Sequence, residues 1–320
     1  MTVKLDLYDK KILYELDMGG RQSFSEIGKK VRLSKNAVEY RVKNLMKEGV
    51  IEYFYTVVDA YKLGYTNYRV YLHLQGLTKN KEDELADYLM KHKNIWWIGK
   101  LDGAWDFGFV IWTKTPAEFY EMWVEFLDKF RPYIRDKLIS TFIEYIHYPR
   151  DYLLEGEQPK KEAWIIGGRG KARYDEMDMK ILRALASSAR MPTTEIAKIV
   201  KTTPAVVTYR IKKLTESGVI QGYRAEINLK ALGYVYYKVD IDLNDMSVYL
   251  KLMRFAEAHP NIVYIDRTIG GKDFEADFIV RDIHHLREIF GEINKLFGDK
   301  IRSYEWYVLL TQYKYSYVPM

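Results

Sequence analysis

Residues 34–51 read SKNAVEYRVKNLMKEGVI, and residues 203–220 read TPAVVTYRIKKLTESGVI. In both stretches apolar side chains recur at the spacing of one helix face, after a Ser or Thr that can cap the helix and before a glycine that can end it. Each stretch therefore predicts an amphipathic helix on a small core. The expected apolar stripes are Ala37, Val38, Val42 and Leu45 in the first helix and Val206, Val207, Ile211 and Leu214 in the second.

The likeness of these two stretches extends along the chain of 320 residues. At an offset of 169 positions, about 22 of the 60 pairs from Asp6 to Tyr65 are identical without a gap, far above the roughly one in twenty expected by chance. Further along, the two copies align again at an offset of 167, where NIWWIGKLDGAWDF (94–107) matches NIVYIDRTIGGKDF (261–274). The chain is therefore two copies of one unit.

The first part of each unit has the pattern of three short helices. In the first copy Asp6 precedes an apolar face, a second short helix is expected from Ser25, and the chain turns just before residue 34. Three such helices are typical of a helix-turn-helix module, whose last helix enters the major groove of DNA. The second copy repeats the pattern from residue 174.

The second part of each unit predicts a β-sheet domain. Residues 66–76 and 236–244 alternate apolar and polar side chains, as half-buried strands do. The first copy then predicts helices near 82–92 and 116–130 and strands near 95–101, 106–113 and 137–148. The order βαββαβ is ferredoxin-like and leaves one sheet face without helices. We expect the sheet of the other copy to cover that face.

The fold class predicted from these patterns is α+β, with two copies of a winged or helix-turn-helix domain followed by a ferredoxin-like βαββαβ domain. The expected bounds are 1–65 and 66–150 for the first copy, 151–173 for a linker, and 174–233 and 234–320 for the second. Lys and Arg exceed Asp and Glu by 3 in the first helical domain and by 4 in the second, whereas the ferredoxin-like domains have net charges of −1 and −2. Basic modules of this kind are typical of phosphate-binding surfaces.

The outward faces of the two quoted helices are the predicted DNA contacts. Residues 29–47 contain seven basic residues and one acidic one, and residues 198–213 contain five basic residues and none acidic. Two alternatives stay open, namely a merely solvated helix face and, for the two arginines, ion pairs with Glu26 and Glu195. The predicted DNA-binding residues are Ser34, Lys35, Asn36, Glu39, Tyr40, Arg41, Lys43, Asn44, Thr203, Pro204, Thr208, Tyr209, Arg210, Lys212 and Lys213.

The chain resembles the Lrp/AsnC family of feast/famine transcription regulators in the order of its motifs. These are LDxxDxxILxxL, then GR, an EI-containing helix, LSxxxVxYRVxxLxxxGVI and LGY, followed by a βαββαβ domain with GxxD between its middle strands. The resemblance covers nearly all of both copies. It implies a sequence-specific regulator that binds double-stranded DNA and responds to a small effector such as an amino acid. It also implies dimerisation through the second domain, so we expect an intramolecular pseudo-dimer, with further homo-oligomers left open.

The same resemblance places the effector near the GxxD turns, at Gly103, Asp106, Gly270 and Asp273. Each turn is also explained as a simple hairpin turn that uses the positive φ open to glycine. The five tryptophans Trp96, Trp97, Trp105, Trp112 and Trp123 are expected in the core and between the sheets, without a ligand role.

An enzyme is the alternative from another class. A minority of proteins with this organisation are similar to siroheme decarboxylases of the heme and heme d1 pathways, in which catalysis is associated with an HNY-like stretch in the central strand. The matching residues here, 95–100 and 262–267, contain no histidine. We therefore expect a regulator rather than an enzyme and assign no catalytic residue. An architectural DNA-binding protein without an effector is a third alternative.

Composition argues against several other classes. The chain has no cysteine, which excludes disulfides and thiolate ligands, and its six histidines follow no metal-ligand spacing. We expect neither a cofactor nor a metal. No apolar run approaches the ~18 residues of a membrane-spanning helix, and the chain start has no signal-peptide core. We therefore expect no membrane association and a cytoplasmic location.

Overall fold

The computed structural model describes residues 2–154, 162–168 and 170–319, so residues 155–161 of the expected linker lie outside the described part. Each copy begins with three helices, as the sequence predicts, and a strand follows them. In the first copy these are α1 (Leu7–Asp17), α2 (Phe24–Val31), α3 (Lys35–Lys47) and β1 (Ile51–Val58). In the second they are α6 (Glu176–Leu185), α7 (Thr193–Val200), α8 (Pro204–Glu216) and β7 (Ile220–Ile227).

Local chemistry sets the ends of these helices. The Ser34 hydroxyl accepts a hydrogen bond from the backbone N–H of Ala37 at 3.1 Å and caps α3, and Thr203 caps α8 in the same way. The second helix begins one residue earlier than expected, with Ser23 as its cap. The expected apolar stripe of α8 is wrong at one position, because Val206 is 36 % exposed while its neighbour Val207 is buried.

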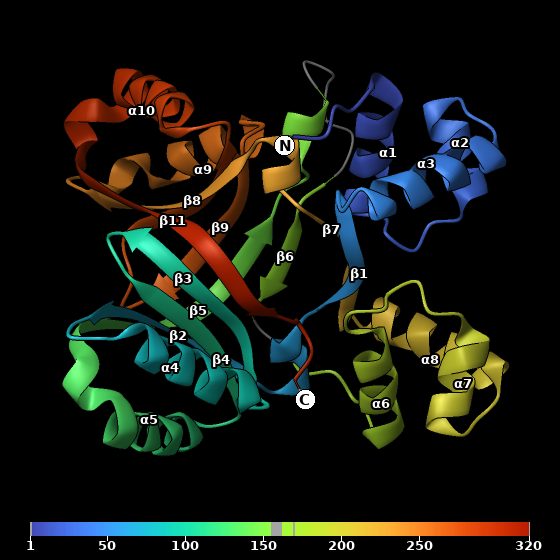
Figure 1. Ribbon diagram of the computed structural model, residues 1–320, viewed down its shortest axis with the longest axis horizontal. Coiled ribbons are helices and arrows are strands. Elements are labelled where there is room, and N and C mark those ends of the chain that lie inside the picture. The colour runs from blue at the N-terminus through green and yellow to red at the C-terminus, as the bar shows by residue number, and fades with distance from the viewer. Residues whose placement is uncertain (1, 155–161, 169, 320) are drawn as a thin grey trace.

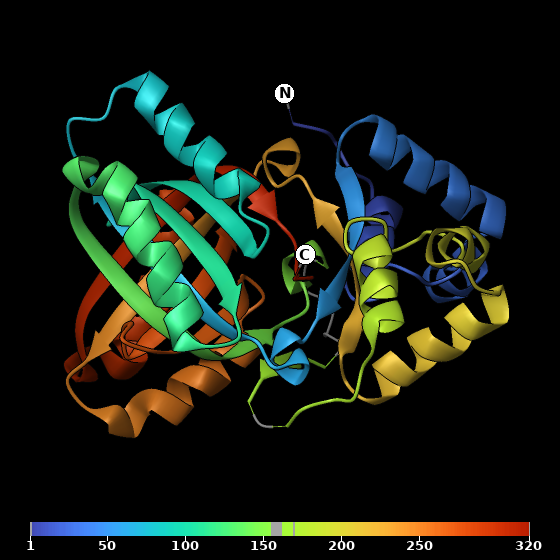
Figure 2. The same cartoon turned by 90° about the horizontal axis from the view of Figure 1, so that it is seen from below.

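The strands β1 and β7 pair antiparallel and form a two-stranded ribbon that joins the two helical modules. Figures 1 and 2 show this ribbon between the barrel and the two modules, which lie on the same side of the molecule. Each strand is the wing of its own helix-turn-helix, so the wings themselves hold the modules together. The sequence does not predict this pairing, because the two strands lie about half a chain apart.

The second part of each copy has the predicted βαββαβ order. The first copy contributes β2 (Thr66–Leu74), α4 (Lys79–Lys91), β3 (Ile95–Gly103), β4 (Phe107–Thr113), α5 (Pro116–Phe130) and β5 (Ile134–His147). The second contributes β8 (Val235–Leu243), α9 (Tyr249–Ala258), β9 (Ile262–Ile269), β10 (Phe274–Val280), α10 (Ile283–Phe297) and β11 (Ile301–Tyr315). The helices cover the outer surface (Figure 1).

The two sheets join at their edges and close into an eight-stranded barrel. The strand order is β2-β4-β3-β11-β8-β10-β9-β5, and β5 pairs back onto β2. The contacts between copies are the β3–β11 and β5–β9 pairs. Closure satisfies the backbone groups that each four-stranded sheet would expose at its edges. Within the expected linker, β6 (Trp164–Gly167) pairs with β5 outside the closed ring.

The expectation of half-buried strands is wrong for the polar face of β8. Tyr237, Val239 and Ile241 pack against the outer helices, as predicted. The alternate residues Lys238 and Asp240 are not in solvent, since they are 3 % and 1 % exposed. They point into the barrel, where charged groups are costly unless they are paired. The barrel interior is therefore the part of the fold that needs a functional explanation.

Candidate ligand pocket

A pocket of about 510 Å³ opens in the barrel at the end next to the β1–β7 ribbon. This volume lies within the range of small-molecule sites. Both ferredoxin-like domains line the pocket, and residues 226–230, at the end of β7 and the start of its connection to β8, line it together with Glu52 of β1. The two copies and the ribbon thus form the site jointly.

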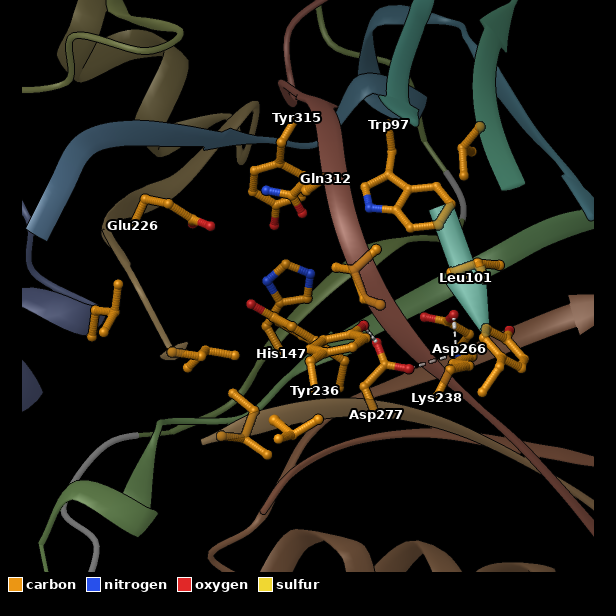
Figure 3. A pocket seen from close by; sticks show the side chains of 18 of the residues that line it. Trp97, Leu101, His147, Glu226, Tyr236, Lys238, Asp266, Asp277, Gln312 and Tyr315 are labelled. Atoms are coloured by element: carbon orange, nitrogen blue, oxygen red, sulfur yellow. Dashed lines mark hydrogen bonds and ion pairs between the residues drawn. The ribbon is translucent and has the colours of Figure 1, made fainter. Parts of the chain in front are cut away.

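Opposite walls of the pocket differ in chemistry. The first copy contributes the apolar side chains Trp97, Leu101, Val110 and Phe142, in addition to the polar Arg69 and His147. The wall from the second copy carries polar side chains that Figure 3 shows side by side, namely Tyr236, Lys238, Asp266 and Asp277. A ligand with a flat apolar face and a polar edge would contact both walls favourably.

The polar wall is an alternating network of charges. The Lys238 ammonium contacts Asp277 Oδ1 at 2.9 Å and forms a shorter contact with Asp266 Oδ2. Arg69 of β2 reaches across the barrel to Glu275 at 2.6 Å and to Asp266 at 3.2 Å. Each buried cation thus has two carboxylate partners, which offsets much of the cost of removing it from water.

Carboxyl groups outnumber cations in this network, and their pKa values reflect it. Burial, followed by the charge of Glu275, raises the pKa of Asp240 to about 8. Burial raises the pKa of Asp266 to about 6 against the opposing charge of Lys238. Burial alone would lower the pKa of Lys238, but Asp266, Asp277 and Glu275 raise it above its ordinary value. The wall therefore holds protons on both acidic and basic groups near neutral pH.

His147, the last residue of β5, also lines the pocket and is 1 % exposed. Burial, followed by the charge of Arg224, lowers its pKa well below the ordinary value, so the imidazole is neutral. Arg224 Nη1 lies 3.4 Å from His147 Nδ1. Because a guanidinium only donates, Nδ1 accepts and the proton sits on Nε2, 3.2 Å from the Tyr317 hydroxyl. The Nε2–H therefore donates to the Tyr317 hydroxyl, and both side chains line the pocket.

Arg224 is itself fixed by Asp17, the last residue of α1. The two side chains form a bidentate pair with distances of 2.7 and 2.8 Å, and both are fully buried. Asp17 also accepts a hydrogen bond from the backbone N–H of Arg150 at 2.9 Å. A continuous buried network thus connects His147 in the barrel to the first helical module.

The predicted DNA-binding residues lie on exposed faces of α3 and α8. Tyr40 and Tyr209, which occupy equivalent positions in the two copies, are each 67 % exposed. Lys43 and Lys212 are exposed and form ion pairs one turn away on their own helices, at 2.9 Å and 3.7 Å. Such surface pairs are weak and do not withhold a lysine from a phosphate.

The two arginines of the predicted DNA set have other partners than expected. Arg41 contacts Asp6 at 2.8 Å and Asp9 at 2.7 Å, at the start of α1. Arg210 contacts Asp175 and Asp178 in the same way, each at 2.8 Å. The expected alternative partners Glu26 and Glu195 are wrong, because the acidic caps of the first helices lie closer. Both arginines brace the helical modules.

The structure places the GxxD turns outside the pocket lining. Asp106 and Asp273 accept hydrogen bonds from the backbone N–H groups of Leu74 and Leu243, at 2.7 and 2.8 Å, and so fix strand ends. Gly103 and Gly270 adopt positive φ values of 124° and 85°. These contacts match the turn explanation, and the effector role stays a prediction.

Within the described residues, no group of three or more His, Asp or Glu side chains is arranged to hold a metal ion. In that same part of the chain, no helix is both long and apolar enough to cross a membrane.

The fold and the pocket together define a tandem winged helix-turn-helix protein whose two ferredoxin-like domains enclose one cavity. The family of winged helix-turn-helix DNA-binding domains matches residues 5–52 and 174–221. An uncharacterized HTH-type transcriptional regulator of Pyrococcus furiosus is 32 % identical over 125 residues, which cover 39 % of this chain and 83 % of that protein. The regulatory protein AsnC of Haemophilus influenzae is 30 % identical over 132 residues, covering 41 % and 87 %. The chain belongs to the Lrp/AsnC family.

A solved structure extends the likeness to the whole chain. The crystal structure of the siroheme decarboxylase NirDL matches with a TM-score of 0.64 at 12 % identity, covering 98 % of this chain and 94 % of that one. The same enzyme in complex with an iron-uroporphyrin III analogue matches with a TM-score of 0.63. The tandem arrangement and the closed barrel are thus a fold that this chain shares with that structure over nearly its whole length.

This match contradicts the expectation that the chain is not an enzyme. That expectation depended on the absence of histidine from residues 95–100 and 262–267. Trp97 and Asp266 from these two stretches line the pocket, and so does a histidine from a different strand, His147 of β5. The sequence signal that points to it is weak, because His147 merely ends the last predicted strand of the first copy.

Proposed function

We propose that this chain is an enzyme that binds a tetrapyrrole of the siroheme type in the barrel pocket and decarboxylates it. The observation that carries the proposal is a pocket in the barrel, lined by a buried neutral histidine, in a chain whose fold over nearly its whole length is that of the siroheme decarboxylase NirDL. Because identity to NirDL is only 12 %, the chemistry must be supported by this chain's own residues.

The residues present fit such a substrate. The planar ring has an apolar wall to lie against at Trp97, Leu101 and Val110. His147 and its partner Tyr317 both line the pocket, so this pair can offer a hydrogen bond to the substrate. Decarboxylation removes CO₂ and puts a proton in its place, so the site needs both exclusion of water and a proton source. The barrel interior provides the first, and the protonated groups of its polar wall provide the second.

The test is direct. Purified protein is titrated with siroheme under anaerobic conditions, and we expect saturable changes in the visible absorbance spectrum with one site per chain. Incubation should then give a product lighter by whole CO₂ units, resolved by mass spectrometry. A His147→Ala variant should bind with an altered spectrum. Absence of any spectral change and of CO₂ loss with the unaltered chain would contradict the proposal.

DNA binding is a second candidate function, because both winged helix-turn-helix domains match a DNA-binding family and present exposed, mainly basic helices. The proposed contacts are the outward residues of α3 and α8, with the arginines acting as braces. Lys43→Ala and Lys212→Ala should each reduce the slope of log affinity against log salt by ~1 if each lysine meets a phosphate. Lys295→Ala, on the outer helix α10, is the matched control. Equal slopes in all proteins would assign both lysines to a solvated surface.

A regulator that responds to an amino acid at the GxxD turns, and an architectural DNA-binding protein, are the two forms that the DNA-binding function could take. A screen of the amino acids for a thermal shift, with Asp106→Ala and Asp273→Ala as variants, separates them. A ligand whose effect disappears in both variants supports the effector prediction.

A further inference from the structure

Two buried arginines share one carboxylate on the ribbon side of the pocket, the side formed by β7 and the connection that follows it. Arg224 binds Asp17 in its bidentate pair, and Arg150 Nη1 lies 3.4 Å from Oδ1 of the same Asp17. The side chains of Arg150 and Asp17 are 6 % and 0 % exposed. In the polar wall, by contrast, Arg69 and Lys238 have two carboxylate partners each. The ribbon side thus buries one cation more than its carboxylate balances, which is costly without a further anion.

Glu226 of β7 also lines the pocket, but it does not neutralise Arg150. Burial raises the pKa of Glu226 to about 6, although the charge of Arg150 opposes this. A carboxylate in an ion pair with a guanidinium would instead have a lowered pKa. In Figure 3, Glu226 lies across the pocket from Lys238 and Asp266. The surplus charge of the ribbon side is therefore well separated from the acids of the polar wall.

Arg150 also has an unused hydrogen-bond donor. It lines the pocket, and its Nη1 donates to the carbonyl oxygen of Ala225 in β7 at 2.9 Å. Its buried Nε has no acceptor within the described part of the chain. Because buried donors in native proteins are nearly always paired, an unpaired guanidinium donor beside a cavity indicates a place for a ligand acceptor.

Lys230 adds a second cation to the ribbon side. It begins η4 (Lys230–Leu232), lines the pocket and is exposed, and among the described residues it forms no ion pair. The residue 169 positions earlier, at the equivalent place of the first copy, is Tyr61. The Tyr61 ring packs edge-on against buried Trp112, with centroids 6.1 Å apart. The second copy thus presents a free cation to the pocket where the first copy has an aromatic ring in its core.

We propose that Arg150 and Lys230 bind carboxylates on the rim of the substrate, an inference that rests on the proposed function. A macrocycle of the siroheme type carries carboxylates around a flat ring. The ribbon side supplies cations that need an anion, whereas Asp266 and Asp277 of the polar wall repel one. The substrate therefore binds with a carboxylated edge on the ribbon side, and these two residues set its orientation.

Lys230→Ala tests the exposed cation without disturbing the core. We expect the Kd for iron-uroporphyrin III, measured by visible absorbance, to rise about 5- to 20-fold, between the effect of an exposed ion pair and that of a hydrogen bond to a charged group. The salt dependence of binding should weaken as well. Lys230→Arg, which keeps the charge, should bind within about threefold of the unaltered chain. Lys295→Ala, on the exposed face of α10 and outside the pocket lining, is the matched control and should leave the Kd unchanged.

Arg150→Gln separates anion binding from a structural role. The variant leaves Asp17 and Arg224 as a balanced buried pair. The free protein should therefore be no less stable to urea than the unaltered chain, because only the surplus cation is removed. The Kd for iron-uroporphyrin III should nevertheless rise by about tenfold or more, as expected for a lost hydrogen bond to a charged group.

Catalysis gives an independent measurement. A contact that is the same in the bound substrate and in the transition state changes KM alone. Lys230→Ala should therefore raise KM for siroheme by the same factor as the Kd and leave kcat within about threefold. A residue that merely supports the fold would not produce this split.

The outcomes are distinct. A Lys230→Ala or Arg150→Gln protein that binds iron-uroporphyrin III within twofold of the unaltered chain overturns the assignment of that residue while the proposed function stands. An Arg150→Gln protein that does not fold makes Arg150 structural, and Lys230→Ala then decides the inference. An unaltered chain that binds iron-uroporphyrin III but releases no CO₂ from siroheme overturns the proposed function and leaves the carboxylate site in place. A chain that binds neither compound overturns both.

Discussion

Asp240 provides a sharp test of the charged barrel interior. Its side chain points inward from β8, the residue is 1 % exposed, and neither carboxylate oxygen accepts a hydrogen bond from the described residues. Burial, followed by the charge of Glu275, raises its pKa from 3.8 to about 8. A raised pKa in the folded state means that stability is fully present below pH 3.8 and is lost as pH rises toward 8.

The magnitude follows from proton linkage. Between about pH 4 and pH 7 the unfolded chain releases this proton and the folded chain keeps it, which costs about 1.4 kcal/mol for each pH unit, or on the order of 4 kcal/mol in all. The Asp240→Asn substitution mimics the protonated carboxyl and removes this cost. We therefore expect the variant to match the unaltered chain near pH 4 and to be more stable by a few kcal/mol at pH 7.

The assay is urea unfolding followed by tryptophan fluorescence at a series of pH values from 4 to 8. Asp242→Asn is the control, since Asp242 lies on the same face of the same strand but pairs with Lys272 at 2.9 Å and is partly exposed. The control should shift the whole curve by a constant amount. Parallel pH curves for Asp240→Asn and the unaltered chain would show that Asp240 is ionised in the folded state and would refute the reasoning.

Three other substitutions probe the rest of the molecule. Asp17→Asn leaves the buried Arg224 guanidinium without its charge partner and should destabilise by about 3–5 kcal/mol, seen as a lower Tm; an unchanged Tm would contradict the buried network. Gly103→Ala places a Cβ 2.6 Å from a backbone carbonyl at a φ of 124° and should cost about 1–3 kcal/mol, whereas Gly291→Ala, with open space around its Cβ, should not destabilise. Burial, then Arg224, lowers the pKa of His147 below 6.5, so stability is lost as pH falls. His147→Gln should therefore unfold at a lower pH than the unaltered chain; an identical acid midpoint would contradict this.

Much of the fold follows from the sequence. The repeat, the three-helix modules and the order βαββαβ are confirmed, because apolar periodicity and capping residues are local properties of the chain. The need for a partner sheet is also confirmed, since a ferredoxin-like sheet has one uncovered face. The expected contact between the copies was two facing sheets, and the observed one is a closed ring. The pairing joins edge strands that lie far apart in the chain, β3 with β11 and β5 with β9, so no local sequence pattern predicts it.

The site was harder to predict, for a related reason. The alternation in β8 marks Lys238 and Asp240 as polar, and a strand pattern assigns polar side chains to solvent unless something covers them. The barrel covers them with the other copy. His147 was missed for the same reason, because the search for a histidine followed the central strands and the pocket takes its histidine from β5.

The sequence by itself determined that this chain is a duplicated unit with two basic helical modules and two ferredoxin-like sheets, since these features depend on residues close together in the chain. Only the tertiary structure decided that the sheets close into one barrel and that Asp266 and Glu275 of the second copy pair with Arg69 of the first inside it. The physical reason is that burial changes what a charge does. On a solvated strand Lys238 would be an ordinary surface lysine. Between Asp266 and Asp277 in the closed barrel, the two carboxylates raise its pKa and keep it protonated.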